Sequence, residues 1–397
     1  MKVLGRDIRL GDPESADIVI FDETDNYHVR KALNKNYSIA IFNRRPEDIW
    51  IGFRVVLYFF RFLSQFSFKE AIKHRRGFLI GALSQLRSIY AESCLVAMKP
   101  KAVVTFIDND SNFHWISKRC RRFPLIAIQN GFRPRPAPYD TNDYSGYYLQ
   151  HLFCMGRHAV ELFPKMGYQV ENFYPVGSLR ASLNFDQQQS NFNDKYDMLV
   201  VSSWYGNCGY QQDAQDVMRS MKIMDHFLSK YIKDRAIKAA VILRRDRDSE
   251  HWFMPEIGMS EDNYYREIYG DCIEIIENTY PKRNIFPLMQ ESHIIVTCLC
   301  SALIDAFGIG KKVLFCDFIG SDWYYQDLPS SIVTHNSNYD SFAERLDELR
   351  KMPQAEYLQA NQENQKYYIS NPQDKPTYQA IAEKIDQIIE NAKLMRI

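Results

Sequence analysis

The sequence lacks the features that mark several large classes of protein. It has 49 Lys and Arg against 49 Asp and Glu, so its formal net charge is zero, whereas nucleic-acid-binding domains are normally basic. It contains no GxxxxGK[ST] phosphate loop, no clean GxGxxG turn and no HExxH or HxH spacing. We therefore expect no nucleic-acid partner, no P-loop, no cofactor and no metal site.

Disulfide frameworks, signal peptides and membrane spans also have little support. The eight cysteines form no CxxC pair and several lie in apolar runs, which is typical of a reduced, cytoplasmic protein. The N-terminus has no continuous apolar segment, so no signal peptide is expected. The most apolar stretch, 49–66, contains Arg54 and Arg61 and does not suit a membrane span. We predict a mostly buried helix there, with a helix lying on a membrane surface as the alternative.

The length and the apolar pattern predict two α/β domains. A chain of 397 residues exceeds the usual size of one domain. Short apolar runs alternate with longer helical patterns, which indicates βαβ units and parallel sheets. A polar, Gln- and Asn-rich stretch at 184–195 is the best linker candidate. We predict two Rossmann-like domains, 1–185 and 196–397, with a cleft between them and with the option that the last helix, 378–395, packs on the first domain.

Three strand ends in the second half carry candidate donor-binding residues. The strand at 294–298 is followed by Cys300 and Ser301 and then by a helix that contains Asp305. A helix start at the carboxyl end of a parallel strand is a ready anion site. Two further strands end in polar groups suited to phosphate, which are Ser202, Ser203, Arg244 and Arg245.

Two strand ends in the first half carry candidate acceptor-binding and catalytic residues. The strands at 102–107 and 125–129 are expected to be neighbours, which brings Asp108 and Gln129 to one rim of the sheet. We predict these two as catalytic residues, with Asp108 as the base that takes the proton of an acceptor hydroxyl. The alternative for Asp108 is a cap of the helix at 110–121. The residues predicted to bind the acceptor are Asn109, Asn130, Gly131, Phe132 and Arg133.

The order of these segments resembles the GT-B glycosyltransferases of bacterial surface-polysaccharide synthesis. The match to their C-terminal signature rests on Thr297, Ser301, Asp305, Ala306, Gly308 and Val313. Arg244 matches the Arg of an R-P-H-P element found in polyol-phosphate and Kdo transferases, although the His and second Pro are missing. The Gln129-Asn130-Gly131 turn is similar to a Q-H-G turn of the glycerophosphotransferase-like proteins, with Asn130 in the position of the family's His.

The resemblance implies a metal-independent transferase that moves a sugar from a nucleotide-sugar donor to a glycan such as O-antigen, capsule or lipopolysaccharide. It implies a glycan or lipid-linked saccharide as acceptor, and a cytoplasmic protein that contacts the inner membrane peripherally. Trp204 and Phe132 are expected as exposed aromatic platforms for sugars. Two alternatives stay open, a polyol-phosphate transferase and a non-catalytic two-lobed binding protein.

Overall fold

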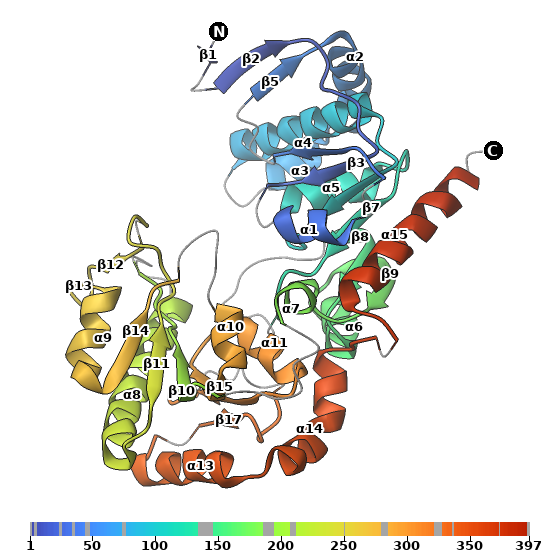
Figure 1. Ribbon diagram of the computed structural model, residues 1–397. Helices are drawn as coiled ribbons and strands as arrows, with labels where there is room; N and C mark the ends of the chain where they lie inside the picture. The colour runs from blue at the N-terminus through green and yellow to red at the C-terminus, as the bar shows by residue number, and fades with distance from the viewer. Residues whose placement is uncertain are drawn as a thin grey trace.

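The structure, a computed structural model, has two α/β domains (Figure 1). It describes residues 2–3, 6–23, 26–33, 36–43, 48–73, 77–133, 146–185, 194–206, 212–249, 251–278, 285–320, 328–335, 337–372 and 374–394. This part of the chain contains two six-stranded sheets, and every strand pairing within them is parallel. The predicted α/β class with two Rossmann-like sheets is therefore confirmed.

The first sheet has the strand order β4-β3-β6-β7-β8-β9 and helices on both faces. Side chains alternate along β3, since Ile18 and Ile20 enter one core and Val19 and Phe21 the other. The strands are β3 (Ile18–Phe21), β4 (Ile39–Phe42), β6 (Ala102–Thr105), β7 (Leu125–Ile128), β8 (Tyr148–Cys154) and β9 (Gln169–Pro175). One face is covered by α1 (Asn26–Ala32), α7 (Leu179–Asn184) and α15 (Thr377–Leu394), and the other by α4 (Phe78–Met98), α5 (Ser111–Arg119) and α6 (Arg157–Lys165).

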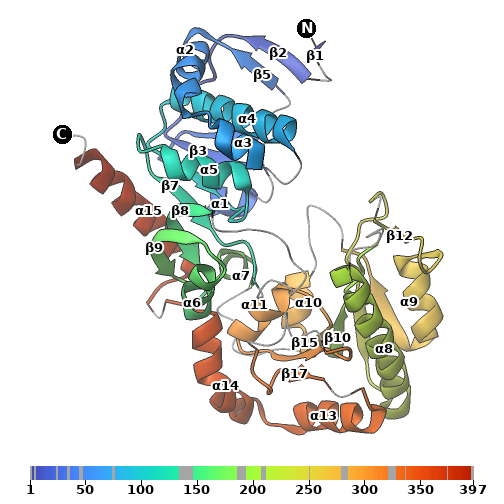
Figure 2. The same ribbon diagram turned by 180° about the vertical axis from the view of Figure 1, so that it is seen from behind.

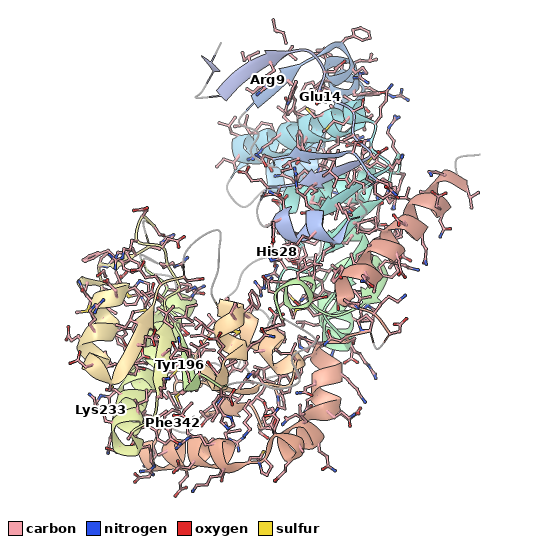
Figure 3. The ribbon with its side chains drawn as sticks, in the orientation of Figure 1. Arg9, Glu14, His28, Tyr196, Lys233 and Phe342 are labelled. Atoms are coloured by element: carbon pink, nitrogen blue, oxygen red, sulfur yellow. The ribbon has the colours of Figure 1, made fainter. Side chains whose placement is uncertain are left out.

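The second sheet has the order β14-β11-β10-β15-β16-β17, which reverses direction between β10 and β15. Ligands of open α/β sheets bind at such a reversal, beyond the carboxyl ends of the strands. The strands are β10 (Tyr196–Val201), β11 (Ala239–Ile242), β14 (Ile273–Ile276), β15 (Ser292–Thr297), β16 (Lys312–Cys316) and β17 (Val333–Thr334). Tyr196 and Phe342 are labelled in Figure 3 and both belong to this domain's core.

Helices and a small hairpin complete the second domain. They are α8 (Gln212–Arg235), the hairpin of β12 (Phe253–Met254) and β13 (Met259–Ser260), α9 (Glu261–Tyr269), η2 (Gly270–Cys272), α10 (Ile285–Gln290), α11 (Ala302–Gly308), α13 (Tyr339–Lys351) and α14 (Gln354–Tyr368). From α14 the chain returns to the first domain, where Ile381 and Ile385 of α15 enter its core. Gly177 allows this return, because its φ is +92° and a Cβ there would lie 2.5 Å from Asn371 Oδ1.

The apolar stretch at 49–66 differs from the prediction in two ways. It begins with a strand, β5 (Asp48–Ile51), which pairs with β2 (Arg6–Leu10) in a small sheet that also holds β1 (Lys2–Val3). The helix α2 (Phe53–Phe62) and the short η1 (Leu63–Gln65) follow, and α3 (Phe68–Lys73) leads into α4. Only Val55 and Phe62 of α2 are buried, so the expectation of a mostly buried helix is wrong. Among the residues described, no helix is both long and apolar enough to span a membrane.

Candidate functional site

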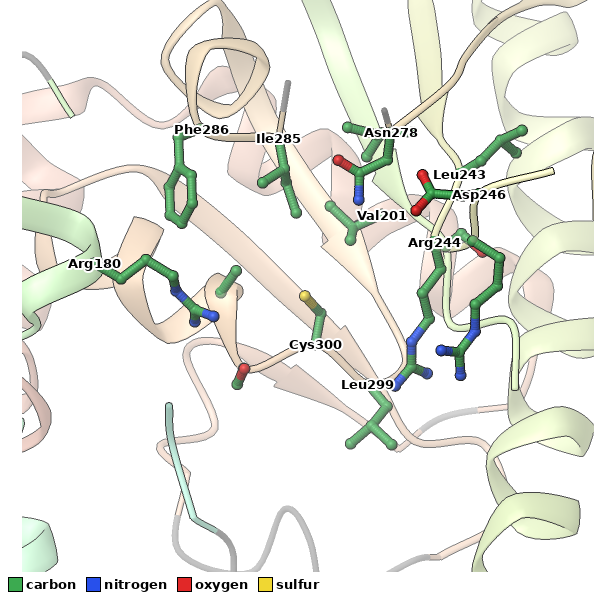
Figure 4. A pocket seen from close by; sticks show the side chains of 15 residues that line it. Arg180, Val201, Leu243, Arg244, Asp246, Asn278, Ile285, Phe286, Leu299 and Cys300 are labelled. Carbon is green, nitrogen blue, oxygen red and sulfur yellow. The ribbon is translucent and has the colours of Figure 1, made fainter. Parts of the chain in front are cut away.

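A cavity of about 450 Å³ lies at the carboxyl ends of β10, β11 and β15, where the strand order of the second sheet reverses. Arg244 and Ser301, which follow different strands of one predicted sheet, both line it. Figure 4 shows Arg244 on one side, Arg180 on the other and Cys300 between them. The full lining is Arg180, Val201, Ser202, Ile242, Leu243, Arg244, Arg245, Asp246, Asn278, Ile285, Phe286, Leu299, Cys300, Ser301 and Ala302.

Arg244 and Arg245 bring two adjacent positive charges into this cavity. The Arg244 guanidinium lies over the Tyr205 ring, 4.9 Å from its centroid, and Arg245 Nη2 donates to the Tyr205 carbonyl at 3.4 Å. Burial and the neighbouring Arg244 lower the pKa of Arg245. Within the described residues, Arg244 Nη1 and Arg245 Nε are buried and make no hydrogen bond. Buried donors of this kind suit an anionic ligand.

Glu261 holds the backbone that carries the two arginines. This carboxylate at the start of α9 is fully buried and accepts from Arg244 N at 2.7 Å and from Arg245 N at 2.9 Å. It also accepts from the Ser202 hydroxyl, which in turn accepts from Trp204 N at 3.1 Å. Burial outweighs these hydrogen bonds and raises the pKa of Glu261 to about 7. Ser202 thus lines the cavity, but its hydroxyl is already used to fix the cavity wall.

The remaining predicted donor residues divide between the cavity and the core. Ser203 is fully buried and joins β10 to β15, through Thr297 Oγ1 at 3.0 Å and Leu299 N at 2.8 Å. Cys300 and Ser301 line the cavity, and the Ser301 hydroxyl does not cap α11. Burial raises the pKa of the Cys300 thiol.

Asp305 lies one turn into α11 and contacts the first domain rather than the cavity. Its side chain is fully buried, and its Oδ2 accepts from Arg180 Nη2 at 2.8 Å and from Arg180 Nε at 3.2 Å. Arg180 lies on α7 of the first domain, so this ion pair joins the two domains. The guanidinium also lines the cavity, which makes Arg180 a cation that the first domain supplies to the second domain's pocket.

Four of the five predicted acceptor residues form a loop that meets the cavity at Ser301, and they are Asn130, Gly131, Phe132 and Arg133. A Cβ on Gly131 would lie 3.0 Å from Ser301 Oγ, so the two domains touch closely at this point. Asp108 accepts from Arg133 Nη2 at 2.6 Å and Nε at 3.2 Å, and Arg133 Nη2 also donates to Asn130 Oδ1 at 2.8 Å. Asp108 is fully buried in this pair, so the structure presents it as the anchor of the loop.

Other side chains around this loop have structural contacts. The Gln129 amide donates to the Gly131 carbonyl at 2.9 Å and accepts from Met155 N at 2.9 Å, which fixes the turn. Asp110, not Asp108, caps α5 by accepting from Phe113 N, so the alternative role for Asp108 is wrong. Asn109 is exposed beside the loop.

The two aromatic platforms expected from the sequence are also wrong. Trp204 is fully buried, and its indole N–H donates to the His251 carbonyl at 3.1 Å. Phe132 is 5% exposed and stacks on His158, with ring centroids 5.1 Å apart. Both rings belong to the core that spans the domain junction, so neither offers a face to a sugar.

Several solved structures are similar to this chain along nearly its whole length. The wall teichoic acid polymerase TagF has a TM-score of 0.54 at 11% identity, covering 94% of this chain and 89% of that one. A co-structure of S. aureus MnaA with UDP has a TM-score of 0.53 at 14% identity, covering 94% and 96%. The UDP-GlcNAc 2-epimerase from Neisseria meningitidis, bound to UDP-GlcNAc, has a TM-score of 0.51 at 12% identity, covering 94% and 99%.

The chain has the GT-B fold. No protein-family model and no curated protein matches the sequence. At these identities the comparisons establish the architecture alone, and the function has to be argued from the site.

Two residues of this candidate site escaped the sequence analysis. Arg180 lies in the first turn of the short helix α7, shortly after its N-cap Ser178, and belongs to no motif of the sequence analysis. Glu261 lies 17 residues after Arg244, in a polar helix start with no distinguishing motif. No spacing rule links either residue to the pocket, because both reach it through tertiary packing.

Proposed function

We propose that this chain is a glycosyltransferase that uses a nucleotide-activated sugar to extend a cell-surface glycan. The observation that carries the proposal is the arginine-lined cavity at the strand reversal of the second sheet. Its volume of about 450 Å³ falls within the range of small-molecule sites. Guanidinium groups bind phosphate oxygens in pairs, so the lining matches the charge and geometry of a nucleoside diphosphate.

The donor's phosphates would lie between Arg244 and Arg245 on one side and Arg180 and Ser301 on the other. Negative charge grows on the leaving diphosphate as the bond to the sugar breaks. Fixed cations in a partly dry cavity stabilise that charge without rearranging. Because the guanidinium groups of Arg244 and Arg245 supply this positive charge, we expect transfer to proceed without a metal ion or cofactor.

The acceptor, a glycan or lipid-linked saccharide, would bind against the loop that Asp108 anchors. This loop meets the donor cavity at Gly131 and Ser301, so an acceptor bound there would lie beside the donor. For Asp108 to take the acceptor's proton, Arg133 must first release one carboxylate oxygen. The proposal therefore includes a movement of this loop when the acceptor binds.

A polyol-phosphate transferase is the second candidate, and one comparison favours it. The TagF structure, a wall teichoic acid polymerase, was determined after a soak with CDPG. A pocket that binds the diphosphate of a nucleotide sugar would also bind an activated polyol phosphate, because the shared group is the diphosphate. A non-catalytic binding protein would bind the same nucleotides, but it would not release nucleotide slowly from the donor.

A ligand screen tests these proposals. UDP-, GDP-, CMP- and dTDP-sugars and CDP-glycerol are compared by thermal shift, where a ligand at 100 times its Kd stabilises the fold by about 2.7 kcal/mol. Arg244→Ala should remove the shift that the best donor gives. The matched control is Arg247→Ala in the same loop, which pairs with Glu277 outside the cavity and should keep the shift. A screen without any stabilising nucleotide, or an equal shift in both variants, would contradict the donor site.

A further inference from the structure

The first domain exposes a large apolar surface far from the donor cavity. Of the 16 large hydrophobic side chains that are exposed in the described part, ten lie between Phe53 and Leu83. They lie on α2, α3 and the start of α4, which pack together at the end of the first domain opposite the second domain (Figure 2). We call this surface the α2–α4 face. Clustering on this scale marks an interaction site, because scattered exposed hydrophobic residues are ordinary but contiguous ones are not.

The α2 helix explains how the face arises. Phe53, Val56, Leu57 and Phe60 follow the i, i+3, i+4, i+7 spacing, so they form one stripe along the helix. Their exposed fractions run from 39% to 80%, while Val55 and Phe62 on the other side of α2 are buried. The helix is thus apolar on two sides, and packing on α4 uses only one of them.

Basic residues accompany this apolar surface. Residues 51–83 contain six Lys or Arg and a single acidic residue, Glu70, which pairs with Arg119. Among the described ones, Arg61 and Lys69 are exposed. Arg122 lies over the rings of Tyr58 and Phe62 at the border of the face. An apolar stripe with a basic rim matches the interfacial zone of an anionic bilayer, with acyl chains for the stripe and phosphates for the rim.

We propose that the α2–α4 face docks this protein on the surface of an anionic membrane. A second copy of the chain is the less suitable occupant. A two-fold dimer places the same patch on both sides of the contact, so it would bring the basic rims together with Glu70, already paired with Arg119, as the one acidic residue of 51–83. Lipid headgroups supply the missing negative charge. Docking in this way leaves the donor cavity free, since the cavity lies in the other domain.

Vesicle co-sedimentation of the full chain tests the proposal. We expect wild type to bind vesicles that mix phosphatidylcholine with phosphatidylglycerol, more weakly at high salt, and to stay in solution with phosphatidylcholine alone. Phe53→Ser with Phe60→Ser should weaken this binding by at least about tenfold, because each exposed ring loses its apolar contact. Arg61→Gln with Lys69→Gln should weaken it by about tenfold through lost charge.

A matched control distinguishes vesicle binding through the α2–α4 face from non-specific hydrophobic adsorption. Phe253→Ser with Leu394→Ser removes exposed apolar side chains elsewhere, 48% and 70% exposed, and should bind vesicles as wild type does. Circular dichroism verifies that each variant is folded. Wild type that stays in solution with anionic vesicles would overturn the proposal. So would a concentration-dependent dimer that Phe53→Ser with Phe60→Ser dissociates while vesicle binding is absent, because the face would then join two copies.

Discussion

Replacing Glu261 by Gln should weaken nucleotide binding in the donor cavity while it leaves the unfolding free energy of the second domain nearly unchanged. The substitution keeps the shape of the side chain but turns one acceptor oxygen into an N–H donor. Both oxygens of Glu261 now accept, one from Arg244 N and the Ser202 hydroxyl and the other from Arg245 N. The amide N–H of Gln would point at one of these donors and could not accept its hydrogen bond. The backbone at Arg244 and Arg245 should therefore be held less rigidly, and with it the two guanidinium groups.

The magnitude follows from two opposing effects. Burial raises the pKa of Glu261 from 4.5 to about 7, so well above pH 7 the buried charge costs about 3 kcal/mol at 1.36 kcal/mol per unit. Gln removes that charge, but its N–H group leaves one of the buried donors around it without an acceptor, which costs about 1–3 kcal/mol. Because the two nearly cancel, we expect a change in unfolding free energy below about 2 kcal/mol, with nucleotide affinity reduced about tenfold.

The pH dependence of stability has a definite sign. The folded-state pKa of Glu261, about 7, lies above its ordinary 4.5, so the folded protein binds a proton that the unfolded chain releases. Its contribution is fully present below pH 4.5 and is lost as the pH rises to about 7. Urea denaturation across this range should therefore give a steeper decline for wild type than for Glu261→Gln.

Asp225 provides the control for this experiment. It is fully buried, accepts from the hydroxyls of Tyr264 and Tyr269, and burial raises its pKa from 3.8 to about 7, but it lies outside the cavity lining. Asp225→Asn should flatten the pH profile in the same way and leave nucleotide affinity unchanged. The affinity is measured by calorimetry with the nucleotide that stabilises wild type most. Equal affinity in both variants would refute the argument that Glu261 shapes the cavity.

Three further substitutions test contacts around the domain junction. Asp108→Asn should lower the free energy of unfolding by about 3 kcal/mol in urea denaturation, because it leaves Arg133 without its buried counter-charge. An unchanged midpoint would show that the pair is not needed. Asp305→Asn should have an effect of about the same size, since Arg180 loses its partner across the domains, and calorimetric scans would reveal it as a lower Tm. Gly177→Ala should destabilise by more than about 1 kcal/mol, because φ is +92° and Asn371 occupies the space; a thermal melt like that of wild type would disprove this.

The sequence predicted those parts of the site that follow from strand order. Buried parallel strands are continuous apolar runs, so β6, β7, β10, β11 and β15 were visible as such. The residue that follows each strand lies at the carboxyl edge of its sheet. This regularity is sufficient to bring Arg244 and Ser301 into one cavity, although they are far apart in the chain.

Exposure could not be predicted in the same way. Apolar and aromatic residues look alike in a sequence whether they pack or face solvent. Trp204 was expected at the surface and lies in the core, while most of the apolar α2 was expected in the core and is exposed. The difference depends on which neighbouring element covers a side chain, and that is decided by packing between segments remote in sequence.

By itself, the sequence determined two parallel α/β sheets and the sheet edge where the candidate site lies, because local apolar periodicity and the chirality of βαβ units fix both. Tertiary structure alone decided that Arg180 of the first domain lines the cavity of the second domain. Tertiary packing likewise decided that Glu261 accepts hydrogen bonds from the backbone of Arg244 and Arg245. It also decided that Asp108 is paired with Arg133. These contacts join residues with no fixed spacing along the chain, and only the packing of the two domains brings them within bonding distance.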